Sequence, residues 1–269
     1  MLRDLQIEWM KVKNYRTFWI LLGITLISIP GFNYMLYNIM DNKFPKQRHG
    51  GPSLLGSPFA FPDVWQTVGW NAGMLFLIPA ILIITLTTNE FTYKTHRQNI
   101  IDGWSREQFI RVKLIEVLLL SLGTTLFVLL TALAFGYIGN KVPADISVWK
   151  DSRFVFFYFV QMISYSLIAF LLSILIKRAG LTMGIFFIYM IVEHIIVGLI
   201  GRILKINAVD YLPEEVTNKL IPFPYIKAIV SPDDQSRWES HIPFYLAVAF
   251  LYVVIYCLGT SRYFTKKDL

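Results

Sequence analysis

The chain has 269 residues, of which 55% are apolar and only 16% charged, and its formal net charge is +7. Soluble domains carry about 25% charged residues, and a soluble chain this apolar would expose patches that aggregate. The composition therefore argues against a soluble protein and favours a membrane protein, and we expect no nucleic-acid partner because no soluble basic domain is visible.

Residues 1–16 are expected to form an amphipathic helix on the inner membrane surface, in contact with lipid. Leu2, Leu5, Trp9 and Val12 follow helical spacing, and charged residues occupy the intervening positions. The alternative is an ordinary tail next to the membrane. The first apolar stretch begins near Thr17 and is too long for a cleaved signal peptide, so we expect a retained first helix.

Six stretches have the length of about 20 mostly apolar residues that a helix needs to cross a bilayer. The first contains Pro30 and Gly31, where a kink is expected, and the second contains Pro79. We therefore predict an all-α integral membrane protein with a single transmembrane domain over residues 1–269. The predicted spans are 17–39, 68–88, 114–138, 154–176, 181–200 and 243–260.

Basic residues favour one orientation of these six spans. If both termini are cytoplasmic, the inner segments hold 13 basic residues in about 52, and the outer segments hold 11 in about 85. Because cytoplasmic loops are enriched in Lys and Arg, both termini are predicted to be cytoplasmic. The inner segments are 1–16, 89–111, 177–180 and 261–269, and the outer segments are 40–67, 139–153 and 201–242.

The loops differ in character. Residues 40–67 are rich in Gly and Pro and are predicted to be irregular, whereas 177–180 is a tight inner turn. The segment 201–242 is the longest outside the membrane, and part of it, Leu220 to Val230, is too apolar for a free loop. Short helices could dip into the outer leaflet there or pack onto the top of the bundle.

The inner loop 89–113 is predicted to contain a short helix, a turn and the start of the third span. Ser105 is a suitable N-cap, with Gln108 as its capping-box partner, and Gly103 permits a sharp turn. The short helix would present Ile100, Ile101 and Trp104 to the cytoplasm. Exposed apolar residues rimmed by charge indicate a docking surface, and the alternative is an amphipathic loop that faces the membrane.

One ionisable pair, Glu193-His194, lies within a predicted span. Such residues are rare in membranes and usually face a partner or a functional path. The pair is therefore a candidate intramembrane polar site for substrate or protons, or a structural contact between helices or subunits. Gln161 and Ser164 in the preceding span are possible partners.

Motifs for catalysis are absent from the sequence. It has no G-x-x-x-x-G-K-[ST] phosphate loop, no H-E-x-x-H zinc motif and no G-x-S-x-G serine elbow. We therefore predict no catalytic residue, no metal site and no cofactor in this chain, so the protein is not expected to be an enzyme.

The inner loop resembles the coupling-helix region of ABC-2 type permeases, especially those of bacitracin and lantibiotic resistance and of sodium export. In these, an acidic residue ends the second span, Thr follows, and Ser-Arg precedes a Lys that begins the third span. Glu90, Thr95, Ser105-Arg106 and Lys113 match this pattern. Where many members have Gly before the Thr and Pro before the Ser-Arg, this chain has Lys94 and Gly103-Trp104.

The resemblance implies the permease subunit of an ATP-driven exporter. A second permease copy or a paralogue would complete a dimer, and a separate ABC ATPase dimer would bind ATP and Mg²⁺. The alternatives are a stand-alone proton-coupled secondary transporter that uses Glu193 and His194, and a membrane-bound enzyme. The residues implied in ATPase coupling are Glu90, Thr95, Arg97, Asn99, Ile100, Ile101, Asp102, Gly103, Trp104, Ser105 and Arg106, and we further predict that Glu90 anchors the loop through Arg97 or Arg106.

Overall fold

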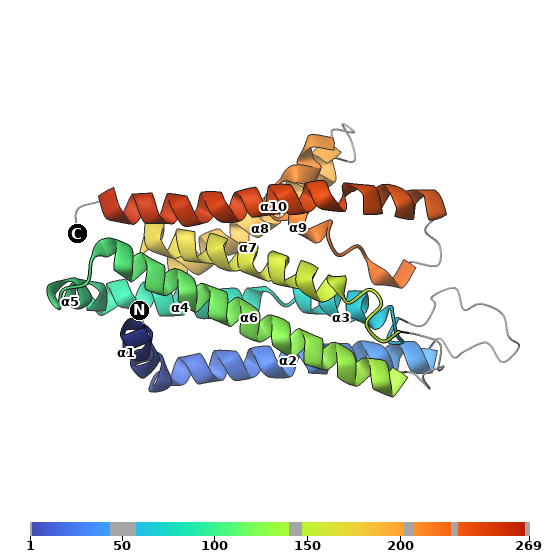
Figure 1. Cartoon of the computed structure of the whole chain (residues 1–269), viewed down its shortest axis with the longest axis horizontal. Coiled ribbons are helices and arrows are strands. Elements are labelled where there is room, and N and C mark those ends of the chain that lie inside the picture. The colour runs from blue at the N-terminus through green and yellow to red at the C-terminus, as the bar shows by residue number, and fades with distance from the viewer. Residues whose placement is uncertain (1, 44–57, 140–146, 202–206, 227–230, 267–269) are drawn as a thin grey trace, which may run out of the picture.

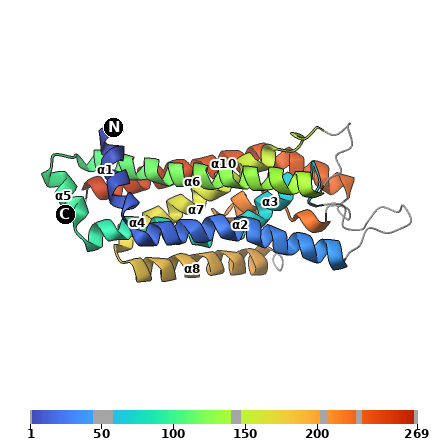
Figure 2. The same ribbon diagram turned by 90° about the horizontal axis from the view of Figure 1, so that it is seen from below.

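The computed structural model describes residues 2–43, 58–139, 147–201, 207–226 and 231–266, and in these ranges it contains helices and no strand. Most helices run along the long axis of an elongated bundle, and both termini lie at the same end (Figures 1 and 2). The α-helices are α1 (Leu2–Lys13), α2 (Arg16–Lys43), α3 (Val64–Gly73), α4 (Leu77–Thr92), α5 (Thr95–Ile101), α6 (Arg106–Gly139), α7 (Arg153–Ile176), α8 (Ala179–Ile196), α9 (Glu215–Asn218) and α10 (Pro232–Lys266).

Five of the described helices are long and apolar enough to cross a membrane: α2, α6, α7, α10 and α8 with the π-helix η1 (Val197–Gly201) that continues it. The pair α3 and α4 passes the same test when taken together, although it is bent by 47°. Large apolar side chains such as Ile27, Leu126 and Phe250 are exposed on the outside of the bundle. Because water does not tolerate so much apolar surface, the chain is an all-α membrane protein.

α7 forms the centre of the bundle. Of its most apolar stretch, 61% of the residues are buried, against 17% for α2, α8 and α10. Its side chains Phe154, Tyr158 and Met162 join the largest apolar core, together with Trp65 from α3 and Val128 from α6. The other long helices therefore surround α7 and present their outer faces to the membrane.

The predicted second span is broken in two. α3 ends at Gly73 and α4 begins at Leu77, so the sequence prediction of one helix over 68–88 is wrong at this point. Pro79 is the third residue of α4, where a backbone N–H has no partner within the helix, and its missing N–H is tolerated there. Pro30, in contrast, lies inside a helix that runs without interruption from Arg16 to Lys43.

The last helix is longer than predicted. α10 begins at Pro232, eleven residues before the predicted span, and Pro243 lies inside it. Residues 232–242 of the predicted outer segment are therefore helical. The remainder holds the 3-10 helices η2 (Asn207–Tyr211) and η3 (Pro224–Ile226) on either side of α9.

The described part of the outer segment packs onto the bundle. Val216, Leu220 and Ile221 are buried in the main apolar core, which explains why this stretch is so apolar. Packing is therefore the correct alternative for Leu220 and Ile221. Residues 227–230 of the apolar stretch lie outside the described residues, as do 44–57 and 140–146 of the predicted outer loops.

The four segments that the sequence assigns to one side of the membrane meet at one end of the bundle. Gln108 at the start of α6 donates to Asp4 of α1 at 2.9 Å, and Arg106 donates to the carbonyl oxygen of Thr265 near the end of α10 at 3.1 Å. Lys177, in the turn before α8, lies 5.1 Å from the ring centre of Phe91. The predicted grouping of these segments is thus consistent with the fold.

α1 lies across the bundle at that end, perpendicular to the long helices in both views (Figures 1 and 2). Trp9 and Met10 are exposed on its outer side, whereas Glu8 and Val12 are buried against the bundle. The apolar positions of the helix are thus divided between the two sides, and a carboxylate faces inward. The reason for this inward charge is the cluster described next.

Candidate functional site: a charged cluster that holds a short helix

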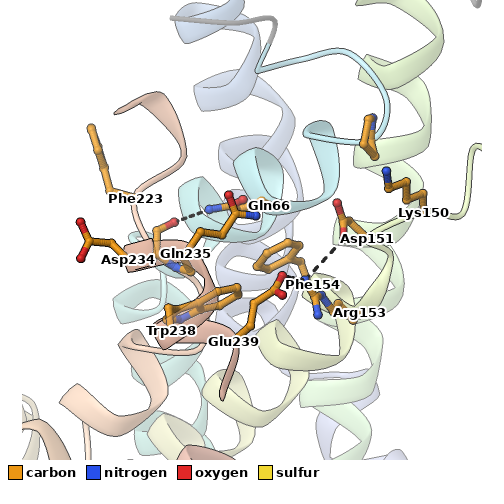
Figure 3. A pocket seen from close by; sticks show the side chains of 12 residues that line it. Gln66, Lys150, Asp151, Arg153, Phe154, Phe223, Asp234, Gln235, Trp238 and Glu239 are labelled. Atoms are coloured by element: carbon orange, nitrogen blue, oxygen red, sulfur yellow. Dashed lines mark hydrogen bonds and ion pairs between the residues drawn. The ribbon is translucent and has the colours of Figure 1, made fainter. Parts of the chain in front are cut away.

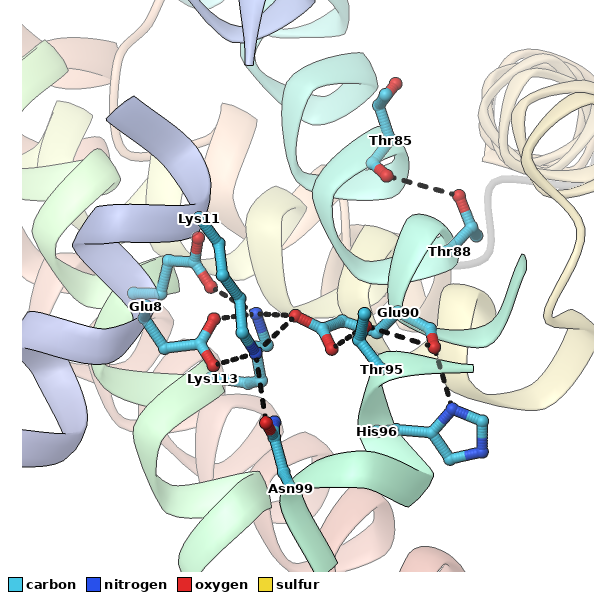
Figure 4. Close-up of polar contacts among 10 residues, drawn as sticks. Glu8, Lys11, Thr85, Thr88, Glu90, Thr95, His96, Asn99 and Lys113 are labelled. Carbon is cyan, nitrogen blue, oxygen red and sulfur yellow. Dashed lines mark hydrogen bonds and ion pairs between the residues drawn. The ribbon is translucent and has the colours of Figure 1, made fainter. Parts of the chain in front are cut away.

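Lys113 of α6 is the centre of a buried cluster of charges (Figure 4). Its side chain is 3% exposed. Its ammonium nitrogen lies 2.6 Å from an oxygen of Glu8, 3.0 Å from one of Glu90 and 3.0 Å from one of Glu116. One cation therefore compensates three carboxylates that come from three different helices, α1, α4 and α6.

Lys11 of α1 supplies the second positive charge. Its Nζ lies 2.8 Å from Glu8 and 3.3 Å from Glu90, and it donates to Oδ1 of Asn99 on α5 at 3.3 Å. The cluster thus joins α1, α4, α5 and α6. Replacing a buried ion cluster by apolar side chains is often neutral for stability, but removing one partner leaves an uncompensated charge. We therefore take the cluster as a device that fixes geometry.

Glu90 also holds the start of α5. Thr95 donates from Oγ1 to a carboxylate oxygen of Glu90, and His96 donates from Nδ1 to the backbone carbonyl of Glu90 at 2.7 Å. Burial of the His96 ring, with Arg97 and Lys177 nearby, lowers its pKa below the ordinary value. The ring is therefore neutral at pH 7, in agreement with its role as a donor to a carbonyl.

The predicted partners of Glu90 are wrong. Its contacts are with Lys113, Lys11 and Thr95, while the Arg97 side chain is exposed and Arg106 donates to Thr265. The two lysines reach Glu90 because α1 and α6 cross the end of α4. Sequence reasoning missed Glu8, Lys11 and Glu116 as members of the site, and identified Lys113 only through the family pattern.

α5 forms the predicted short helix, and one face of it is exposed. Ile101 is 77% exposed and is flanked by exposed Asp102, whereas Ile100 is half-buried. Trp104, predicted to face the cytoplasm, instead packs partly against the apolar cluster around Phe109. The outer face of α5 is therefore narrower than the sequence indicated and is centred on Ile101.

The two turns around α5 have left-handed backbone. Gly103 has φ +100°, as expected for a sharp turn, and Lys94 has φ +56° at the position where the resemblance places Gly. Ser105 is the predicted N-cap, because its Oγ accepts the backbone N–H of Gln108 at 3.0 Å. The side chain of Gln108 bonds to Asp4 instead of completing a capping box.

Glu193 and His194 of α8 contact the start of α9 and the residue before it, which belong to the predicted outer segment 201–242. Oε1 of Glu193 accepts the backbone N–H groups of Glu214 and Glu215 at 2.6 and 3.0 Å, and Nδ1 of His194 lies 3.5 Å from a carboxylate oxygen of Glu214. The suggested partner Gln161 bonds to Asn218 and Tyr165 instead. Glu193 therefore anchors the segment that leads into α9.

A cavity of about 330 Å³ lies at the opposite end of the bundle from α5 (Figure 3). Its charged lining residues pair with one another, since Arg153 lies 2.9 Å from Glu239 and 3.6 Å from Asp151. Trp238 stacks on Phe154 with ring centres 6.0 Å apart. These contacts join the start of α7 to the first turns of α10.

A family model matches residues 27–269, which is nearly all of the chain from α2 to α10. The chain belongs to the DUF2705 family. This family is described as protein of unknown function. No curated protein matches the sequence.

The residues matched by the DUF2705 family model contain only part of the charged cluster. Glu90, Lys113 and Glu116 lie inside the matched residues, whereas Glu8 and Lys11 of α1 lie before them. The matched part of the chain alone would bring two carboxylates to Lys113. α1 adds one further carboxylate and one further cation, so it extends the cluster without changing its net charge.

Proposed function

We propose that the chain is the transmembrane permease subunit of an ATP-driven ABC exporter, with α5 as the coupling helix on which a separate ATPase docks. The observation that carries the proposal is the construction of α5. Its inner side is fixed to α1, α4 and α6 through Glu90, Lys11 and Asn99, and its outer side exposes Ile101. A short helix held in this way suits the transfer of force from a partner to several spans.

The membrane arrangement belongs to the same proposal. The pair α3 and α4 counts as one bent span, which makes six, and α1 lies at the inner surface. Both termini are cytoplasmic in a bacterial inner membrane, as the density of basic residues favours. The permease acts as a dimer with a second copy or a paralogue, and ATP and Mg²⁺ bind to the partner ATPase.

The proposed mechanism is rigid-body rocking. Closure of the ATPase on ATP moves α5, and Glu90 and Lys113 transmit the movement to α4 and α6 because their side chains are bound to each other at 3.0 Å. The two permease halves then rearrange around the substrate path. Buried charge pairs suit this role, since they hold one geometry better than apolar contacts that can slide.

The competing function is a proton-coupled transporter that uses Glu193 and His194. In such a mechanism the carboxylate would exchange protons as helices move. Oε1 of Glu193 instead accepts two backbone N–H groups, and those bonds hold the side chain to the segment before α9 as an anchor. This observation favours the permease over the secondary transporter.

The test is copurification of the tagged chain with a phosphate-loop ATPase encoded beside it, followed by ATPase assays in liposomes. We expect a stable complex whose ATPase rate depends on the permease. Ile101→Asp should reduce complex formation by about tenfold or more, because it places a charge at the centre of the docking face. Ile101→Leu keeps an apolar side chain and should bind like the wild type.

A second variant tests the connection behind the docking face. Glu90→Lys places a third cation between Lys11 and Lys113, and it should uncouple ATP hydrolysis from transport while α5 still binds the ATPase. Charge reversal at Glu90 that leaves coupling intact would refute this mechanism. Failure of any ATPase to bind or to respond to the chain would refute the proposed function itself.

A further inference from the structure

A second cavity, of about 340 Å³, lies where α3 and α4 separate. We call it the α3–α4 cavity. Gly73, Met74 and Phe76, at the break between the two helices, form one side of it, and α7, the end of α8 and the α9 segment form the rest. Non-helical backbone within a membrane is tolerated where it lines a cavity or is covered by protein. The break is therefore placed where such backbone is acceptable.

Two buried oxygens in the lining have no donor among the described residues: Oε1 of Gln161 and Oε2 of Glu214. Gln161 is 6% exposed and Glu214 is 1% exposed. A buried acceptor without a donor is unfavourable by about 1–3 kcal/mol, and more for a charged group. Both oxygens thus require a donor of N–H or O–H bonds, or a cation.

The position of the Gln161 oxygen is set by its neighbours. The amide nitrogen of Gln161 donates to Oδ1 of Asn218 at 2.8 Å, and the hydroxyl of Tyr165 donates to the same oxygen at 2.6 Å. A Cβ added to Gly73 would lie 2.6 Å from Oε1 of Gln161. The absence of a side chain at Gly73 therefore makes the space into which this acceptor points.

The rest of the lining includes aromatic and acidic side chains. Trp70, Phe76 and Tyr165 line the cavity together with Glu214 and Glu215. Aromatic faces attract cations, and a carboxylate pairs with an ammonium group. The amide and carboxylate oxygens in this lining suit a ligand that has N–H donors of its own. The cavity is also large enough for a small organic molecule.

We propose that the α3–α4 cavity binds the primary ammonium group of an organic amine, with Glu214 and Gln161 accepting its N–H bonds and the apolar part of the amine against the aromatic wall. The inference does not rest on the proposed permease function, because the binding belongs to the isolated chain. The structure around His194 supports it as well, since α8 passes there into the π-helix η1, a feature common at functional sites.

Binding should release a proton near neutral pH. Burial, followed by the charges of Glu193 and Glu215, raises the pKa of Glu214 to about 8. The other ionisable groups near it are His194 on α8 at 3.5 Å, Tyr165 on α7 and Tyr189 on α8. At pH 7 the Glu214 carboxyl is mostly protonated, so an incoming ammonium group displaces its proton to solvent and pairs with the carboxylate.

The experiment is isothermal titration calorimetry of the full chain in non-ionic detergent, with 2-phenylethylamine as the probe. We expect saturable binding, with close to one proton released per ligand at pH 7 when buffers of different ionisation enthalpy are compared. Between pH 5 and 8, affinity should rise by about tenfold for each unit by which the pH increases, because less of the Glu214 proton has to be displaced. The neutral 2-phenylethanol and the trimethylammonium analogue, which has no N–H donor, should bind at least tenfold more weakly.

Glu214→Gln should weaken amine binding by tenfold or more and abolish proton release, while Glu239→Gln, the control, should bind within about twofold of the wild type. Glu239 suits this control because it lies outside the α3–α4 cavity and pairs with Arg153 at 2.9 Å. Equal binding of the amine and the alcohol would overturn the proposal, as would wild-type affinity in Glu214→Gln.

Discussion

Two regions of the bundle differ in how their buried carboxylates are paired. At the α5 end, three carboxylates surround Lys113, and Lys11 compensates two of them again. At the break between α3 and α4, Glu214 has two carboxylate neighbours, Glu193 and Glu215, and the imidazole beside it, His194, is largely exposed to its surroundings. The charges of the first region satisfy one another, whereas the second region can accept a cation.

This difference separates a structural role from a binding role. Charges that satisfy one another fix the relative position of helices, and a ligand has nothing to add to them. A carboxylate held in its protonated form by burial and by like charges stores an unfavourable interaction that a cation would relieve. Glu residues therefore have different functions in the charged cluster and in the α3–α4 cavity, because their neighbours differ.

The largest expected effect is the loss of Lys113. Lys113→Met would leave Glu8, Glu90 and Glu116 with only Lys11, and we expect a loss of about 3–5 kcal/mol in the free energy of unfolding. The measurement is thermal unfolding in detergent. Arg111→Met, on the exposed side of the same helix, is the control and should change stability little. Equal effects of both variants would show that the cluster is not a special feature.

A smaller effect is expected from Glu193→Leu, which removes the acceptor of two backbone N–H groups. Each fully buried N–H left without a partner is unfavourable by about 1–3 kcal/mol. Because the N–H of Glu215 is only partly buried, a total loss of about 2–4 kcal/mol is expected. Hydrogen exchange at the amides of Glu214 and Glu215 should accelerate. Glu193→Gln keeps an acceptor oxygen and should retain most of the protection, whereas unchanged exchange in Glu193→Leu would contradict the anchoring role.

The pH dependence of stability should distinguish the α3–α4 cavity from the α5 end of the bundle. The pKa of Glu214 is raised to about 8 in the folded chain from 4.5, so the folded state binds more protons between these values. Its contribution is fully present below pH 4.5 and is lost as pH rises towards 8, by roughly 2 kcal/mol between pH 5 and 7. Glu214→Gln should remove this slope from pH-dependent unfolding curves, and Glu107→Gln, at an exposed carboxylate near α5, should not remove it.

The smallest expected effect concerns Lys94 and its left-handed backbone. Left-handed backbone is unfavourable for a residue with Cβ by about 1–2 kcal/mol, and glycine gives part of this back through greater freedom in the unfolded chain. Lys94→Gly should therefore stabilise the protein by up to about 1 kcal/mol. Tyr93→Gly, one residue earlier at φ −90°, should give no gain. A gain in both variants would remove the backbone explanation.

Much of the helical architecture could be predicted from apolar runs, because a span must be about 20 residues long and α7 matches its prediction within one residue. The break at 74–76 could not be predicted, since Gly73 and Pro79 are compatible with a continuous apolar helix. The short helix α5, the turn at Gly103 and the N-cap of α6 at Ser105 followed from local signals.

The partners of the buried charges could not be predicted in the same way. Glu8 and Lys113 are separated by 105 residues in sequence, and only the crossing of α1 over α6 brings them together. Gln161 and Asn218 meet for a similar reason. The pair Glu193-His194 was found because charge inside a span is conspicuous, but its partner Glu214 lies in a segment whose fold has no local signal.

Helix α4 connects the charged cluster around Lys113 to the α3–α4 cavity. Its sixteen residues form one rod of about 24 Å, with Glu90 in the last turn and the wall of the α3–α4 cavity at the first. A tilt imposed on the α5 end must appear at the cavity, because a continuous helix bends far less readily than the open joint at residues 74–76. A movement at the Glu90–Lys113 salt bridge would therefore pass along α4 and change the angle between α3 and α4 at residues 74–76.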